Sequence, residues 1–185
     1  QPPRLLRSAV SNLRSIYEDR GHTIDATIQN IVIKNPRLRK YAWPPPNLDV
    51  LFRPEAMHPP NDSRPCAQAG CGTHDPSRVV YRQPRQANES LTVVHYGLIA
   101  SADQLMKDAF MRDRLVWEKG VKCFEMEAAG LMNHFPCLVI RGISDYSDTH
   151  KNDEWQGYAA MAAAAYAKEL LLQIPLEQVE TQAPV

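Results

Sequence analysis

The sequence has little of what marks the most common functional classes of protein. Its 21 basic and 21 acidic side chains cancel, so nothing favours a general electrostatic affinity for nucleic acid or for an anionic membrane. No apolar run approaches the roughly 18 residues that a membrane-spanning helix needs. The sequence also lacks a G-x-x-x-x-G-K-[ST] phosphate loop, a G-x-S-x-G nucleophile elbow and a paired-histidine metal motif on a helix. Its function must therefore be sought in other residues.

Cysteine is scarce as well. Four cysteines without a secretory signal favour a reducing compartment, and we expect a cytoplasmic location. The chain starts Gln1-Pro2-Pro3 without an initiator methionine, so we expect a fragment of a longer protein. A hydrophobic fraction of 44% over 185 residues is enough for one domain with a true core.

Helical patterns occupy the two ends of the chain. Apolar side chains recur at helical spacing over residues 3–19, and an Ala-rich helix is predicted over residues 155–172. Residues 24–40 are ambiguous, and a second helix closed by Asn35 and Pro36 is one interpretation. Residues 176–185 form a polar tail or linker. For the basic cluster that follows Pro36, solvent exposure is favoured over a phosphate grip; its members are Arg37, Arg39 and Lys40.

Residues 43–90 form a Pro-rich insert. Ten of the 15 prolines lie between residues 36 and 84, and a long segment without periodicity is typical of a functional excursion or of partial disorder. The insert contains a possible tetrahedral zinc set of two histidines and two cysteines: His58, Cys66, Cys71 and His74. Because the spacing is looser than in a zinc ribbon, free thiols and a Cys66–Cys71 disulfide remain alternatives. A metal here would be structural and would pin an insert that lacks a core of its own.

A strand and a helix are predicted after the insert. Residues 92–100 are rich in β-branched and aromatic side chains, which favours a strand. We expect Ser101 to open a helix as its N-cap, with Gln104 completing a capping box, and the helix to run to about residue 117. Leu105 and Met106 are then either an ordinary amphipathic pair or ligand contacts.

The most informative stretch is residues 123–148, CFEMEAAGLMNHFPCLVIRGISDYSD. It predicts a short strand, a helix over residues 128–134, and a second strand on the apolar run at residues 137–140. Acidic groups follow both strands. A βαβ unit brings two such junctions to the same edge of a sheet, where ligands bind in open α/β folds.

The acidic residues at these junctions are Glu125, Glu127 and Asp145. Each has a non-functional alternative: a solvated helix N-terminus for the two glutamates, a capped turn for Ser144 and Asp145, and core filling for Met126. The polar loop over residues 146–153 is expected to be mobile, with Asp148 and His150 exposed.

The order Phe-Glu-Met-Glu-Ala-Ala, then Arg-Gly-Ile-Ser-Asp, resembles the nucleoside phosphorylase and nucleosidase superfamily, which includes purine nucleoside phosphorylase, uridine phosphorylase and methylthioadenosine/adenosylhomocysteine nucleosidase. The wording is most similar to the domain of fungal proteins that also carry NACHT, ankyrin or TPR regions. The likeness is strong over residues 94–172. Those fungal sequences also carry a cysteine pair near residues 66 and 71.

The resemblance implies roles for individual residues. Glu127 would grip the ribose hydroxyls, Met126 would pack on the sugar, and Asp145 would donate to the purine N7. Further substrate contacts would come from Phe124, Glu125, Ser144, Ser101, Leu105 and Met106. The chemistry suits these residue types, because a carboxylate stabilises positive charge that develops on the sugar, while a carboxylic acid protonates the leaving base. Asp145 would need a raised pKa for that role.

The resemblance also implies a fold, an α/β three-layer α/β/α sandwich with a central mixed sheet. Residues 1–185 would be its C-terminal part, without the N-terminal strands and their phosphate-binding turn. The implied activity is cleavage of the N-glycosidic bond of a purine nucleoside or nucleotide, with ATP a candidate substrate and either phosphate or water the nucleophile. No cofactor is needed for that chemistry, and a homo-oligomer with further domains is expected. A non-catalytic nucleoside sensor and an inactive fragment are the alternatives.

Overall fold

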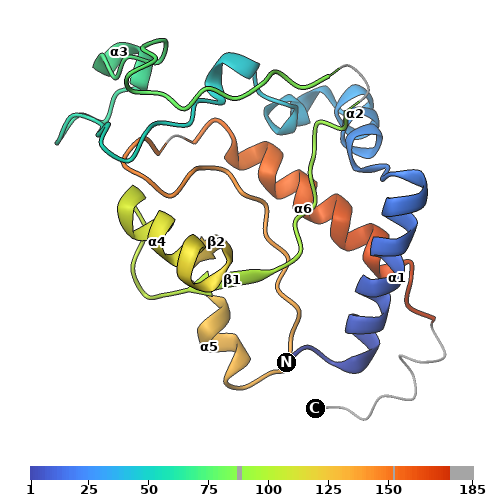
Figure 1. Cartoon of the computed structure of the whole chain (residues 1–185). Helices are drawn as coiled ribbons and strands as arrows, with labels where there is room; N and C mark the ends of the chain where they lie inside the picture. The colour runs from blue at the N-terminus through green and yellow to red at the C-terminus, as the bar shows by residue number, and fades with distance from the viewer. Residues whose placement is uncertain (87–88, 152, 176–185) are drawn as a thin grey trace.

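The computed structural model describes residues 1–86, 89–151 and 153–175, and Figure 1 shows its trace. It combines helices with one small parallel sheet, as in an α/β protein. The expected tail at residues 176–185 lies outside the described residues. In chain order the elements are α1 (Arg4–Arg20), α2 (Ile24–Lys34), the 3-10 helices η1 (Pro36–Tyr41) and η2 (Pro46–Leu48), α3 (Cys66–Ala69), β1 (Leu98–Ser101), α4 (Ala109–Lys119), β2 (Val121–Glu125), α5 (Ala128–Met132) and α6 (Gln156–Leu171).

Three helices form the main core. Helix α6 packs against α1 and α2, as Figure 1 shows for α1 and α6. Helix α1 ends at Gly21, whose φ of +74° suits glycine and whose N–H donates to the Tyr17 carbonyl. The helical predictions at both ends of the chain are therefore confirmed. The buried side chains of this core are Ala9, Leu13, Ile24, Ile28, Tyr158, Ala165, Tyr166 and Leu170.

The sheet of the described residues consists of β1 and β2, which run parallel. Helix α4 lies in the crossover that parallel neighbours require. Ser101 and Glu125 pair in the last register position, so both stand at the carboxyl ends of their strands. This is the edge at which open α/β sheets bind ligands.

The second predicted strand, at residues 137–140, is wrong: these residues form no regular element. Leu138 and Ile140 pack instead against the helical core. Apolar burial is therefore enough to explain the run without a strand partner. The chain then crosses α6 at Gly142, so closely that a Cβ would collide with the carbonyl oxygen of Ala159.

The predicted strand at 92–100 and the predicted helix start at Ser101 also need correction. Of the predicted range, only Leu98–Ser101 belongs to a strand, and at its other end the backbone N–H of Thr92 donates to Asp25 at 3.1 Å. Helix α4 begins after Asp108, whose carboxylate accepts the N–H of Met111 at 3.0 Å. Asp108 is thus the N-cap of this helix, in place of the predicted Ser101.

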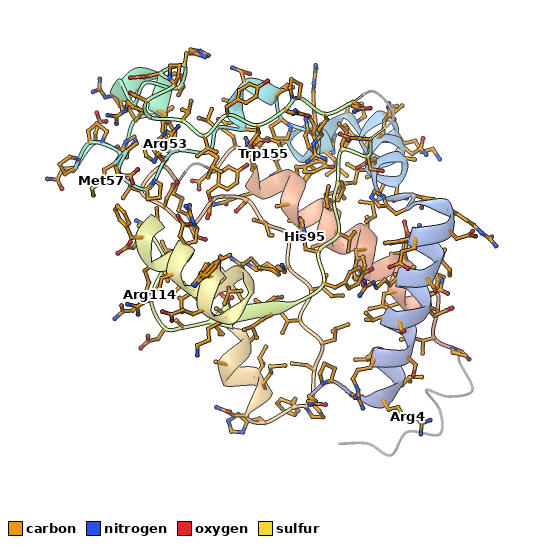
Figure 2. All side chains as sticks on the ribbon, viewed as in Figure 1. Arg4, Arg53, Met57, His95, Arg114 and Trp155 are labelled. Atoms are coloured by element: carbon orange, nitrogen blue, oxygen red, sulfur yellow. The ribbon has the colours of Figure 1, made fainter. Side chains whose placement is uncertain are left out.

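The Pro-rich insert has little regular structure of its own. Phe52 and Val79 form an isolated antiparallel bridge, and the hydrophobic cluster of the insert has three buried members among the described residues: Phe52, Ala56 and Cys71. Two tryptophans join this segment to α6. The rings of Trp43 and Trp155 pack at 5.0 Å, and the Trp155 indole N–H donates to the Leu48 carbonyl at 3.3 Å. Figure 2 shows Trp155 at the start of α6, next to this segment.

Within the described residues, no helix combines the length and apolarity needed to cross a membrane.

Candidate functional site

Glu125 is the most deeply buried acidic group at the end of the sheet. It is 5% exposed, and its Oε2 accepts hydrogen bonds from the N–H groups of Glu127 and Ala128, both at 2.8 Å. Its Oε1 is buried and has no hydrogen-bond partner within the described residues. Burial alone would raise the pKa of Glu125, but the Ser101 hydroxyl, the backbone N–H donors and the Arg141 guanidinium together bring that pKa below its ordinary value. Glu125 is therefore a buried carboxylate held by the turn that follows β2, and Oε1 is the less satisfied of its two oxygens.

The two residues that follow Glu125 are exposed. The Glu127 side chain is 72% exposed and lies 3.9 Å from the Arg141 guanidinium, while its own carboxylate accepts the N–H of Met126 at 3.1 Å. Met126 is 44% exposed, so core filling does not explain it. The pair fits either a solvated helix N-terminus or a surface that is open to a ligand.

A cavity of about 300 Å³ adjoins Glu125 and Glu127. Its other wall is the segment 137–141, which is where the second strand had been predicted. Asp145 is not among its lining residues. A larger cavity of about 610 Å³, between α1 and residues 89–96, has none of the predicted site residues among its lining residues.

Asp145 lies on the loop that follows Gly142. Its Oδ1 accepts the N–H of Ser147 at 2.9 Å, and its Oδ2 forms an ion pair with the Lys151 ammonium at 3.2 Å. Asp145 thus makes the hydrogen bond of a turn, as one of the two interpretations expected, and in addition it pairs with Lys151. To donate a proton to a ligand, Asp145 must release Lys151.

The insert holds the loop on which Asp145 lies. The hydroxyl of Tyr146 donates to the Asp49 carboxylate at 2.6 Å, and the Arg82 guanidinium pairs with the same carboxylate at 2.8 Å. Burial and the Asp49 carboxylate raise the pKa of Tyr146 to about 12, so its hydroxyl stays neutral and able to donate. From α4, Arg112 donates to the Tyr146 carbonyl at 2.8 Å.

Two residues of this loop were expected to be exposed, and both are buried. Asp148 is 6% exposed and accepts the N–H of His150 at 2.8 Å, and the His150 ring stacks on Phe52 with a centroid separation of 3.6 Å. The polar composition suggested exposure, but the insert folds over the loop. The prediction failed because polarity alone does not reveal a distant segment that covers a loop.

The remaining predicted contacts surround the sheet edge. The Ser101 hydroxyl accepts the N–H of Ala129 at 3.0 Å, so it caps α5 rather than α4. Leu105 and Met106 lie between β1 and α4, outside any helix, and Leu105 is exposed. Phe124 in β2 and Ser144 are both half-buried. Their contacts with a ligand stay predictions.

Part of the predicted metal set is also brought together. One ligand atom from each of His58, Cys66 and Cys71 lies within 4.8 Å of the others. His74 is exposed and stands outside this group. Both cysteines are free thiols, so the disulfide alternative is not what this structure adopts.

Arg141 and Lys151 were missed by sequence reasoning. Each faces one of the predicted acidic residues, Glu127 and Asp145 respectively. A sequence signal existed for Arg141, because it comes directly after the apolar run that was expected to end at the ligand-binding edge. Lys151 carries no such signal, since its pairing depends on how the loop turns back.

Comparisons with known proteins identify several similar sequences. A nucleotide-binding leucine-rich repeat (NLR)-like protein of Hyaloscypha variabilis is 41% identical over 92% of this chain and 16% of its own length. The ATP nucleosidase Cap17 of Escherichia coli is 33% identical over 43% of this chain and 17% of its own length. The aminodeoxyfutalosine nucleosidase of Helicobacter pylori is 35% identical over 45% of this chain and 38% of its own length.

No protein-family model and no solved structure matches the chain. The chain spans well under half the length of these curated relatives. It is nevertheless related in sequence to nucleosidases and to an NLR-like fungal protein.

Proposed function

We propose that this chain carries the sugar- and base-contacting part of an N-glycosidase domain, which hydrolyses the bond between a purine and its ribose. The proposal rests chiefly on one observation: a chain similar to nucleosidases has two glutamates beside a cavity at the end of β2. Since the similar bacterial proteins bear nucleosidase names, water is favoured over phosphate as the nucleophile.

In this mechanism the carboxylates have separate tasks. Glu127, exposed at the cavity, accepts hydrogen bonds from the ribose hydroxyls, and Met126 packs on the sugar. Glu125 keeps the turn between β2 and α5 in place through its bonds to the backbone. Negative charge beside the sugar stabilises the cation that develops as the C1′–N9 bond breaks. Water then attacks C1′, and the proton that it loses passes to solvent, from which Asp145 regains the proton that it gives to the base.

Asp145 supplies the proton that the leaving base takes up at N7. The Lys151 ion pair must open first, so binding of the base and release of Lys151 are coupled. Asp145 must also approach the cavity at Glu125 and Glu127, which it does not line. We attribute this approach to substrate closing the loop onto the sheet edge.

The complete fold of this proposal is a three-layer α/β/α sandwich with a mixed central sheet. Two features support it. A two-stranded parallel sheet is unusual, because parallel strands are normally flanked by further strands and covered on both faces. Several large apolar side chains of β1 and α4 are exposed, among them Leu98, Phe110 and Trp117. Strands from a preceding segment, or from a second copy, would cover them.

An adenine nucleotide is the substrate that we test first, because one similar protein is an ATP nucleosidase. The experiment incubates this chain, alone and extended at its N-terminus, with adenosine, inosine, AMP and ATP. Each reaction is run with and without phosphate, and free base is separated by chromatography. We expect free base without phosphate. Base released only with phosphate would mean a phosphorylase, and substrate binding without any base release would favour a non-catalytic sensor.

A further inference from the structure

The ligand atoms of His58, Cys66 and Cys71 have the spacing of a metal site. The Nδ1 of His58 lies 3.1 Å from the Cys71 sulfur and 3.8 Å from the Cys66 sulfur. Around a tetrahedral zinc ion, Zn–S bonds of about 2.3 Å and Zn–N bonds of about 2.0 Å put neighbouring ligand atoms about 3.5–3.8 Å apart. A zinc ion could therefore enter this group with only small adjustments.

The hydrogen bond of His58 Nε2 determines that Nδ1 is the nitrogen available to bind a metal. The Nε2 of His58 lies 2.8 Å from the carbonyl oxygen of Asp62. A carbonyl only accepts hydrogen bonds, so Nε2 carries the proton and Nδ1 presents a lone pair to the two thiols. Metal-bound histidines are oriented by this type of bond from the second ring nitrogen to a backbone carbonyl. The orienting contact of a zinc ligand is thus already in place.

A second, independent observation comes from His150, which belongs to a different segment. Its side chain is 3% exposed, and Nδ1 lies 3.7 Å from the Asp148 carboxylate, while neither ring nitrogen has a hydrogen-bond partner within the described residues. Its ring stands edge-on to that of His58, with a centroid separation of 5.8 Å. Nδ1 has the Asp148 carboxylate nearby, but a buried Nε2 without any polar partner is costly unless something outside the protein chain binds it. His150 is therefore the candidate for the fourth position, although its ring must move closer, since it lies outside the group of ligand atoms that are within 4.8 Å of one another.

We propose that His58, Cys66 and Cys71, with His150 in the fourth position, bind one structural Zn²⁺ ion. Two thiolates and imidazole favour zinc over the hard cations, which prefer oxygen ligands. The insert has reason to need such an ion, since its own buried core is limited to Phe52, Ala56 and Cys71.

The ion would join the insert to the loop after Asp145. His58 already contacts this loop, because its backbone N–H donates to the Thr149 hydroxyl at 2.9 Å. Phe52 of the insert stacks on His150. A bond from zinc to His150 would add a further connection between the two segments, beside the hydrogen bond from Tyr146 to Asp49. The proposed site therefore supports the loop from outside and takes no part in bond cleavage.

The test measures metal directly. Protein without a histidine tag is purified under reducing conditions and analysed for zinc by mass spectrometry, then stripped with a chelator and titrated with Co²⁺. We expect one equivalent of zinc and the strong visible absorption of a tetrahedral cobalt site with thiolate ligands. Cys66→Ser and Cys71→Ser should weaken binding by more than about 100-fold, which exceeds the usual loss for an outer-shell partner. Cys137→Ser and His74→Ala are the matched controls and should bind like the unchanged protein.

Wild-type protein that contains no zinc and binds no Co²⁺ overturns the proposal, as does a Cys66–Cys71 disulfide recovered from reduced preparations. Unaltered binding in the Cys66→Ser/Cys71→Ser double variant overturns the ligand assignment. His150→Ala should shift the cobalt spectrum and weaken binding, and an unchanged spectrum removes His150 from the set. Because none of these readouts uses base release, the metal site and the proposed activity can fail independently.

Discussion

The helical end of this protein and its sheet end differ in how completely their large side chains are buried. At the helical end, α1, α2 and α6 enclose a continuous core in which Leu13 and Leu170 are each 2% exposed. At the sheet end, Trp117 of α4 is 90% exposed and Glu127 points into solvent. Stability is thus concentrated at one end and the candidate chemistry at the other. Substitutions can test that separation.

The largest expected effect is on catalysis, at the sheet end. Asp145→Asn should reduce base release by about 100- to 10,000-fold, because general acid catalysis contributes roughly this much. Its free energy of unfolding should change little, since the carboxylate is near the surface and pairs with Lys151. Turnover rates and denaturant unfolding measure both quantities. Asp103→Asn, an exposed neighbour of β1, is the control. Full turnover in Asp145→Asn would refute the proposed acid.

The opposite outcome is expected at the helical end. Leu170→Ala should lower the free energy of unfolding by about 2–5 kcal/mol, the usual range for a leucine deleted from a packed core. The adjacent Leu171 is 64% exposed, so Leu171→Ala offers a matched control with little expected change. Urea unfolding followed by circular dichroism compares them. Equal losses in the two variants would mean that the helical core is not the main source of stability.

Glu125 connects the two ends of the comparison, because it lies at the site and yet is buried. Glu125→Ala should lower the free energy of unfolding by about 1–3 kcal/mol, since two backbone N–H groups lose their acceptor. Glu125→Gln keeps an acceptor and should recover part of that loss. Chemical denaturation of both variants at neutral pH measures the difference.

The same carboxylate predicts a pH dependence of known sign. The folded-state pKa of Glu125 lies below its ordinary value of 4.5, so its stabilising contribution is complete above that pH. The contribution is lost as the pH falls through the lower, folded-state pKa. Denaturation midpoints between pH 6 and pH 3 should therefore fall more steeply in the unchanged protein than in Glu125→Gln. Parallel curves would show that Glu125 is not a stabilising carboxylate.

The smallest effect is expected at Trp117. In this chain alone, Trp117→Ala should change the free energy of unfolding by no more than about 0.5 kcal/mol, as is usual for an exposed position. In a chain extended at its N-terminus, or in an oligomer, the same change should cost several times more if strands cover α4. Thermal unfolding of both forms makes the comparison. An equally small effect in both forms would show that Trp117 stays exposed in the extended or oligomeric protein as well.

Sequence reasoning succeeded where one local pattern decides the structure. The N-terminal helix followed from apolar spacing and the C-terminal helix from its alanine content, and the position of Glu125 at the end of a strand followed from the change of pattern after it. It failed where distant segments compete. Ser101 is a good N-cap by sequence, but Asp108 takes that role while Ser101 caps α5. An apolar run such as residues 137–140 is equally compatible with a buried strand and with an irregular segment that packs on helices, and the structure has the second.

The sequence predicted which acidic residues belong to the candidate site, but not which side chains they contact. The three acidic groups were singled out, but their partners Arg141 and Lys151 were not, because an ion pair depends on where two segments meet. The burial of His150 was unforeseen for the same reason. It requires Phe52, which lies almost a hundred positions earlier in the chain and has no pattern that links the two.

The close crossing at Gly142 has a consequence for how this protein can vary. Asp145 follows Gly142 by three residues. The contact between Gly142 and α6 therefore limits how far Asp145 can move. Any side chain at Gly142 must lift the backbone away from the carbonyl of Ala159, and Asp145 moves with it. A saturation library read out by folding and by turnover would therefore treat the two positions as one unit. Tolerance of alanine at Gly142 would mean that α6 can move away, and that contacts with the insert and with α4 are enough to position the loop that carries Asp145.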